Sequence, residues 1–84
     1  MKLFIHLLAS GKRLRIDADP DMLAEELLEQ LIELQIILPP GNCPYFFRFE
    51  NKLYGTCLDL EKSLQANNVE ENDIIVLAAI VPDG

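Results

Sequence analysis

The sequence predicts a single α+β domain in which one helix packs across a mixed sheet of four or five strands. Three stretches of the 84-residue chain indicate this architecture. Residues 2–18 alternate apolar and polar side chains on either side of a Ser-Gly-Lys turn, as a hairpin of two strands does. Residues 22–37 repeat apolar side chains at intervals of three and four, as a helix lying on a sheet does. Residues 74–81 form an almost wholly apolar run, which is typical of a central strand.

The predicted hairpin pairs residues 2–9 with residues 13–18. Odd positions from Leu3 to Leu7 carry the aliphatic side chains of one face of the first strand. Gly11 lies in the turn, where a tight hairpin requires a positive φ. We expect the second strand to be half-buried, because its polar and apolar side chains alternate strictly.

The predicted helix follows an Asp-Pro-Asp segment at residues 19–21, whose carboxylates can cap free N–H groups and whose proline suits a first turn. It is expected to run from residue 22 to about residue 37 and to stop at Pro39-Pro40-Gly41. Its glutamates fall mostly opposite the apolar stripe. We expect them to form a solvated back of the helix, and the alternative is a docking surface for a basic partner.

Three further strands are predicted in the second half of the chain. They lie at residues 45–50, at residues 53–54 after a short turn, and at residues 74–81, with a loop or short helix from residue 58 to residue 68. The order strand, strand, helix, strand, strand, strand, with the first and last strands parallel at the centre, is that of a β-grasp fold. We assign residues 1–81 to this domain and residues 82–84 to a short tail.

Composition and charge exclude several classes of function. The chain is 50% hydrophobic and 25% charged, as soluble globular domains are. Its 14 acidic side chains outnumber seven basic ones and give a net charge of −7. Such a surface repels phosphate backbones and anionic lipid, so we expect no nucleic acid and no membrane as partners. The first residues do not fit a signal peptide, and we expect a cytoplasmic protein.

The residues that could carry chemistry are few. Cys43 and Cys57 fit no CxxC or zinc spacing, so we expect two reduced thiols, with one disulfide as the alternative. His6 is the only histidine and lies inside a predicted strand with no acid nearby in sequence. A Cys-His nucleophilic pair therefore lacks an oriented base, and we expect no catalytic residue, no metal and no cofactor.

Short motifs follow one another in an informative order. Residues 1–6 are Met-Lys-Leu-Phe-Ile-His, Gly11-Lys12 ends the hairpin, Pro39-Pro40 follows the helix, and residues 49–54 are Phe-Glu-Asn-Lys-Leu-Tyr. In these motifs the chain resembles ubiquitin over nearly its full length. From the helix onward it is also similar to the small ubiquitin-like proteins of bacterial type VII secretion loci, in Pro39-Pro40, Arg48, Asn51-Lys52, Gly55 and Asn72-Asp73-Ile74.

The resemblance to ubiquitin implies a bacterial protein modifier. Ubiquitin is adenylated at its terminal glycine, which implies Gly84 as the conjugation site and a tail of Ile80, Val81, Pro82 and Asp83 threaded into the activating enzyme. The implied partners are dedicated activating (adenylating) and conjugating enzymes, a deconjugating peptidase and target proteins, as in ubiquitin-like operons that include anti-phage defence. The tail lacks the arginines and the double glycine of ubiquitin, and the alternative is that Gly84 is only where the chain stops.

The resemblance also implies a docking patch of Leu8, Arg48, Ile75 and Leu77. Arg48 takes the place of the central isoleucine of the ubiquitin patch, and a charge there would bar most ubiquitin readers. We expect Leu8, Ile75 and Leu77 to be exposed and apolar; the alternative is that these residues only cover the outer face of the sheet. Lys12 and Lys52 match chain-linking lysines of ubiquitin or are ordinary surface charges.

Two other functions stay open. One is a non-conjugated interaction module of the type VII secretion kind, which binds partners through the sheet face or the acidic helix. The other is a sulfur carrier for cofactor synthesis, which the absence of a terminal Gly-Gly disfavours.

Overall fold

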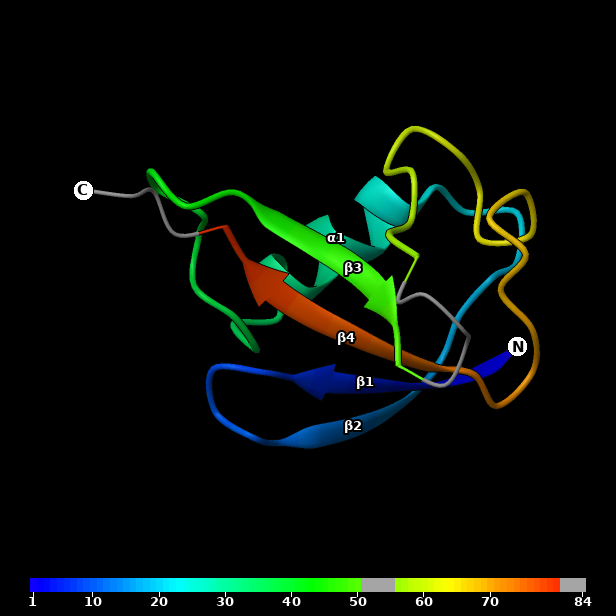
Figure 1. Ribbon diagram of the computed structural model, residues 1–84, viewed down its shortest axis with the longest axis horizontal. Helices are drawn as coiled ribbons and strands as arrows, with labels where there is room; N and C mark the ends of the chain where they lie inside the picture. Colours follow the sequence, from blue (N-terminus) through cyan, green and yellow to red (C-terminus); the bar gives the residue numbers. More distant parts are fainter. Residues whose placement is uncertain (51–55, 81–84) are drawn as a thin grey trace.

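The computed structural model describes residues 1–50 and 56–80, which form one helix beside a four-stranded mixed sheet (Figure 1). The elements in chain order are β1 (Lys2–Leu7), β2 (Arg13–Asp17), α1 (Ala24–Glu33), β3 (Tyr45–Phe49) and β4 (Ile74–Ala79). The sheet order is β2-β1-β4-β3, with β1 and β4 parallel at the centre and both edge strands antiparallel to their neighbours. The predicted α+β class is confirmed, and the arrangement is compatible with a β-grasp. The strand predicted at residues 53–54 lies outside the described residues.

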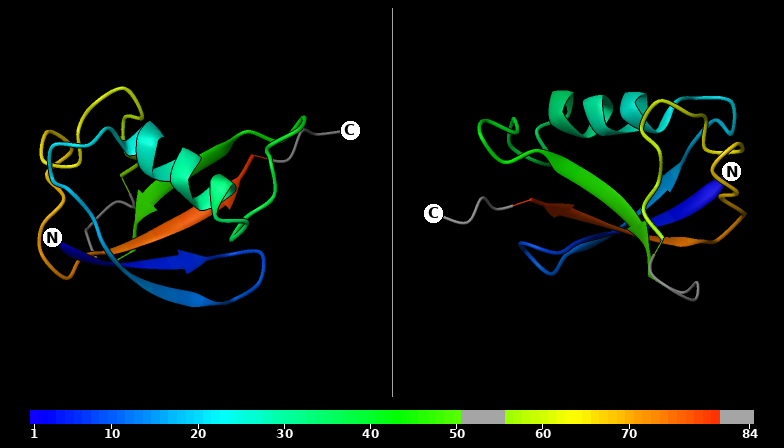
Figure 2. Two further views of the ribbon diagram at one scale, coloured as in Figure 1. Left: turned by 180° about the vertical axis from the view of Figure 1, so that it is seen from behind. Right: turned by 45° about the horizontal axis from the view of Figure 1, so that its top comes forward.

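The helix covers one face of the sheet and leaves the other face open, as Figure 2 shows. Successive side chains of a strand point to opposite faces, so each strand contributes one alternate set to the core. In β1, β3 and β4 the side chains that join the core cluster are odd-numbered, and α1 adds three buried residues to them. The core members from these four elements are Leu3, Ile5, Leu7, Ala24, Leu27, Leu31, Phe47, Phe49, Ile75 and Leu77.

The helix begins and ends inside its predicted limits. It ends at Glu33, before Pro39 is reached, so the prolines do not stop it as expected. Gln35 has a φ of 59°, its N–H donates to the Ile32 carbonyl, and the Ile36 N–H donates to the Leu31 carbonyl, both at 3.0 Å. These two bonds form a Schellman motif, in which a left-handed residue closes the helix. The sequence did not reveal it because glutamine stands where glycine is usual.

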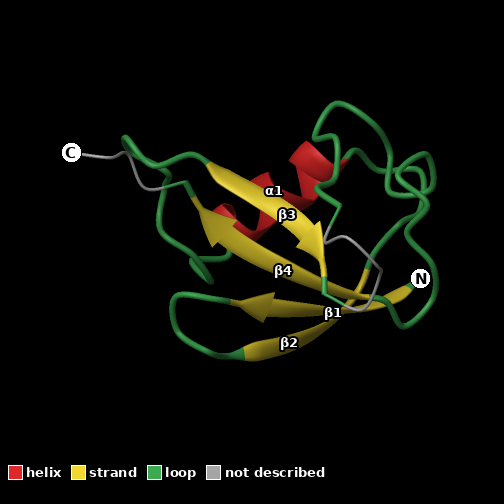
Figure 3. Ribbon diagram, in the orientation of Figure 1, coloured by secondary structure: helices red, strands yellow, loops and turns green. Residues whose placement is uncertain are grey.

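The start of the helix also differs from the prediction. Leu23 is the N-cap residue and makes no side-chain capping bond, and the Asp19 carboxylate accepts the N–H of Asp21 instead. The N–H groups of Ala24 and Glu25 donate to the carbonyls of Lys62 and Leu60, at 3.0 Å each. The long loop before β4, seen beside the start of α1 in Figure 3, therefore supplies the acceptors that a capping side chain usually provides.

Replacing Gln35 by glycine is expected to raise the free energy of unfolding by about 0.5–1 kcal/mol, because glycine adopts a positive φ without steric cost. Gln30→Gly is the matched control, since Gln30 is also exposed but lies inside α1, where glycine costs about 1 kcal/mol. Urea unfolding of the two variants measures both changes. A loss of stability in both would contradict the left-handed geometry of Gln35.

Within the loop at residues 56–73, the Asn67 side chain makes four hydrogen bonds. The Asn67 Nδ2 group donates to the carbonyls of Asp59 and Ser63 at 2.9 and 3.0 Å, and to that of Lys62 at 3.3 Å. Its Oδ1 atom accepts the N–H of Asp59 at 2.7 Å. A loop or short helix between residues 58 and 68 was predicted, and the structure shows a loop, but the Asn67 network within it was not predicted.

Candidate docking surface

The face of the sheet opposite α1 gathers the arginines of the chain. The strand registers align Arg13, His6, Val76 and Arg48 in one row across all four strands. The next row contains Arg15, Phe4 and Ile74. We define the open face as these outward-facing residues together with Phe46, which pairs with Ala78: Phe4, His6, Arg13, Arg15, Phe46, Arg48, Ile74 and Val76. All three arginines of the sequence belong to it.

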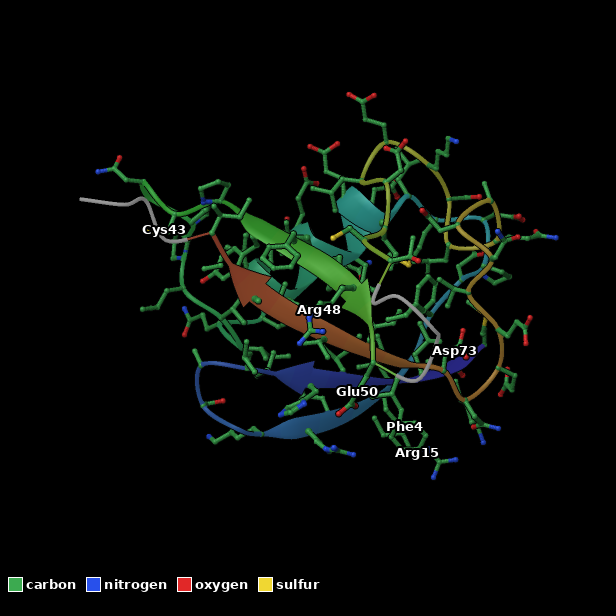
Figure 4. All side chains as sticks on the ribbon, viewed as in Figure 1. Phe4, Arg15, Cys43, Arg48, Glu50 and Asp73 are labelled. Atoms are coloured by element: carbon green, nitrogen blue, oxygen red, sulfur yellow. The ribbon has the colours of Figure 1, made fainter. Side chains whose placement is uncertain are left out.

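One carboxylate on this side of the sheet is already engaged. The Glu50 Oε1 atom lies 3.3 Å from the Arg13 Nη2 atom and 3.8 Å from the Nδ1 atom of His6 (Figure 4 labels Glu50). The His6 Nδ1 atom is buried and has no hydrogen-bond partner among the described residues. Glu50 therefore offsets the charge of Arg13 and lies beside a histidine that gains a charge only on protonation.

The charges of the other two arginines, Arg15 and Arg48, are not offset by a carboxylate of the described residues. Within residues 1–50 and 56–80, no carboxylate forms an ion pair with Arg15 or Arg48. The Arg15 guanidinium lies 5.9 Å from the centre of the Phe4 ring, which is a cation–π distance (Figure 4). A guanidinium held over a ring still has donors free for an anion.

An apolar strip runs along β4 between the arginines. Val76 faces outward but is only 2% exposed, and Ala78 is buried as well. Ile74 and Phe46, on the same face, are half-buried. The open face thus combines an apolar centre with cationic sides, which is an arrangement that suits a protein partner.

The four residues of the predicted docking patch do not lie on one surface of the structure. Leu8 is 52% exposed at the end of β1, and Arg48 is half-buried on the open face. The expected exposure of Ile75 and Leu77 is wrong, because they are 0% and 3% exposed in the core. A continuous apolar run does not show which alternate set faces inward, and pairing with Ile5 and Leu7 of β1 places Ile75 and Leu77 under α1.

The other predicted site residues are only partly described. Ile80 is 53% exposed just after β4, and its N–H donates to the Pro44 carbonyl at 2.8 Å. Lys12 is exposed next to Gly11, whose φ is 73°. Gly84, Lys52 and the tail residues Val81, Pro82 and Asp83 lie outside the described residues, and their predicted roles stay predictions.

An apolar groove at one end of the sheet was not predicted. It has a volume of about 240 Å³ and is bordered by the end of β1 and by the segment after α1, with Leu8, Ile36, Leu38, Tyr45 and Ala79 among its lining residues. Its signal in the sequence is the aliphatic run at residues 36–38, which overlaps the end of the predicted helix at about residue 37. Because α1 ends early, these side chains line a groove instead of continuing the helical stripe.

The remaining predictions about chemistry can be compared with the described residues. Cys43 and Cys57 are free, as the reduced form requires, and Cys57 is exposed. In the described ranges no three His, Cys, Asp or Glu side chains are grouped so that they could hold a metal ion. The same ranges contain no helix with the length and apolar character needed to cross a membrane.

Comparison with known proteins does not assign a family. No protein-family model matches the sequence, and no curated protein matches it either.

Proposed function

We propose that this chain is a ubiquitin-like β-grasp protein that acts as a docking module for other proteins. The open face is the observation that carries the proposal, because arginines flank an apolar strip on a sheet face that no element of the described chain covers. The order of motifs along the sequence and the central parallel pair of strands support the β-grasp assignment. Docking requires no catalytic residue, which agrees with the few chemistry-bearing side chains of the sequence.

Site-specific photocrosslinking in the native host tests this proposal. We place benzoylphenylalanine at Phe46 on the open face, which keeps all three arginines, and, in the matched control, at Glu29 on the exposed back of α1. The expected result is a discrete adduct from position 46 that mass spectrometry identifies as one protein, with no such adduct from position 29. An adduct from position 29 alone would transfer docking to the acidic helix and contradict the proposal.

A second candidate function is that of a bacterial protein modifier, which an adenylating enzyme activates at Gly84 and a conjugating enzyme transfers to target proteins. The exposure of Ile80 favours it, because the chain leaves β4 at the surface, where an activating enzyme can bind. In this function the open face would be the surface that the enzymes of the pathway recognise.

Covalent transfer is tested with three N-terminally tagged copies in the native host. One copy is intact, one lacks Gly84, and one carries an extra serine after Gly84 that blocks its carboxylate. On a denaturing, reducing blot, higher-mass bands are expected from the intact copy alone. Free protein in all three lanes, with the neighbouring genes induced, would exclude the modifier and leave the docking module in place.

If Lys12 and Lys52 link copies into chains, replacing both by arginine is expected to shorten the ladder of the intact copy.

A further inference from the structure

We infer that the partner segment on the open face is acidic and extended, with the pattern acidic–x–apolar–x–acidic. This inference rests on the proposed docking function and names the chemistry of the partner. The open face carries the arginines of a chain whose net charge is −7. The back of α1 carries Glu25, Glu26, Glu29 and Glu33 and no basic residue. The three arginines of the chain are therefore concentrated on the open face.

The carboxylates nearest the open face are occupied. Glu50 pairs with Arg13 at 3.3 Å. Asp17, at the end of β2, accepts a hydrogen bond from the Met1 amino group at 3.0 Å, and this bond holds the pKa of the Asp17 carboxyl below its usual value. Neither acid pairs with Arg15 or Arg48. The planar guanidinium binds a carboxylate through two parallel hydrogen bonds, so these two arginines favour carboxylates of a partner.

The distance between Arg48 and Arg15 determines the spacing of the acidic residues in the partner segment. Arg48 lies on β3 and Arg15 on β2, the two edges of the sheet, with β4 and β1 between them. Three strand spacings amount to about 14 Å across the sheet, and because Arg15 lies one row, or two residues, away from the row of Arg48, the two positions are about 16 Å apart. In an extended segment, residues i and i+4 point the same way and are about 13 Å apart, and residue i+2 points the same way between them. The long arginine side chains cover the remaining distance, so two acidic residues four apart can reach both edges while the apolar residue between them lies over the half-buried Ile74.

A nucleic acid is the less suitable ligand for this surface. The glutamates of α1 and the overall charge of −7 repel a long phosphate backbone, whereas a short acidic segment meets only the local positive face. The apolar strip also offers a contact that a backbone of phosphates does not use.

NMR titration with designed peptides tests the inference. The probe is the capped peptide Gly-Glu-Thr-Val-Thr-Glu-Gly, and its control has glutamine in place of both glutamates. We expect the first peptide to shift the amide signals of Phe4, Arg15, Arg48 and Val76, to bind at least about tenfold more tightly than the glutamine peptide, and to weaken as salt is added.

Two variants with the same change of charge sharpen the test. Arg48→Gln is expected to weaken binding several-fold, whereas Lys62→Gln, in the exposed loop beside the start of α1, is expected to leave it unchanged. Unchanged amide spectra away from position 48 show that the variant is folded.

Three results would overturn the inference. Equal binding of both peptides at the open face would leave the docking function in place and remove the requirement for acid. An adduct from position 46 together with no shifts of open-face amide signals by the acidic peptide would also leave the docking function in place and exclude the acidic pattern. Displacement of the acidic peptide by a single-stranded thymidine oligonucleotide at lower concentration would assign the face to nucleic acid.

Discussion

Replacing Ile75 by alanine is expected to lower the free energy of unfolding by about 2–5 kcal/mol, whereas Ile74→Ala is expected to cost about 1 kcal/mol. Ile75 is 0% exposed between α1 and the neighbouring strands, and its loss leaves a cavity that the packed core cannot fill. Ile74 is half-buried on the open face, where solvent fills the space left by the side chain. The two substitutions remove the same atoms, so their difference measures the inward orientation of position 75.

Urea unfolding of the two variants at equal protein concentration measures this difference. For a domain of this size, a loss at the upper end of the range for Ile75→Ala would remove a large part of the total stability. Equal costs at both positions would show that β4 does not have the register with β1 that places Ile75 opposite Ile5.

The contrast between β1 and β4 explains why part of the fold was predictable. In β1, polar or larger side chains separate Leu3, Ile5 and Leu7, and the alternation shows which set is buried. In β4, residues 74–79 are all apolar. The pattern therefore predicts a central strand, but it does not show whether the odd-numbered or the even-numbered side chains face the helix. The set that faces the helix is determined by pairing with β1, which lies about 70 residues earlier in the chain. Ile75 and Leu77 were therefore misplaced although the strand itself was predicted correctly.

The candidate site, like β4, could be predicted from the sequence only in part. Alternation in β2 places Arg13 and Arg15 on one exposed face, and this could be predicted from local sequence. Arg48 joins them only because β4 lies between β3 and β1 in the sheet order. The row from Arg13 to Arg48 depends on three strand pairings at once, and no local pattern carries that information.

Removing the Asn67 side chain is expected to cost about 2–3 kcal/mol, which is large for a residue outside the hydrophobic core. Asn67→Ala leaves the carbonyls of Asp59 and Ser63 and the N–H of Asp59 without their side-chain partner. The control is Gln65→Ala in the same loop, because the Gln65 side chain is exposed and the residue is held through its backbone N–H. Urea unfolding should show a change within about 0.5 kcal/mol for the control.

The isosteric variant Asn67→Asp separates hydrogen bonding from packing. An ionised aspartate keeps the acceptor for the Asp59 N–H but points its other oxygen at carbonyls, which raises its pKa in the folded state. A raised folded-state pKa means that folding takes up a proton, so the variant is expected to recover stability relative to the native chain as pH falls through that pKa. A variant whose deficit does not change between neutral and mildly acidic pH would contradict the donor role of Asn67.

The effect of Asn67 should extend to the helix. The segment that Asn67 holds contains the carbonyls of Leu60 and Lys62, which accept the N–H groups of Glu25 and Ala24. In Asn67→Ala, amide hydrogen exchange is expected to speed up at Ala24 and Glu25 more than at Leu34, whose bond to Gln30 lies at the far end of α1. Uniform acceleration at both ends would indicate only global destabilisation. A selective effect would show that a loop asparagine replaces the helix cap that residues 19–21 were predicted to provide.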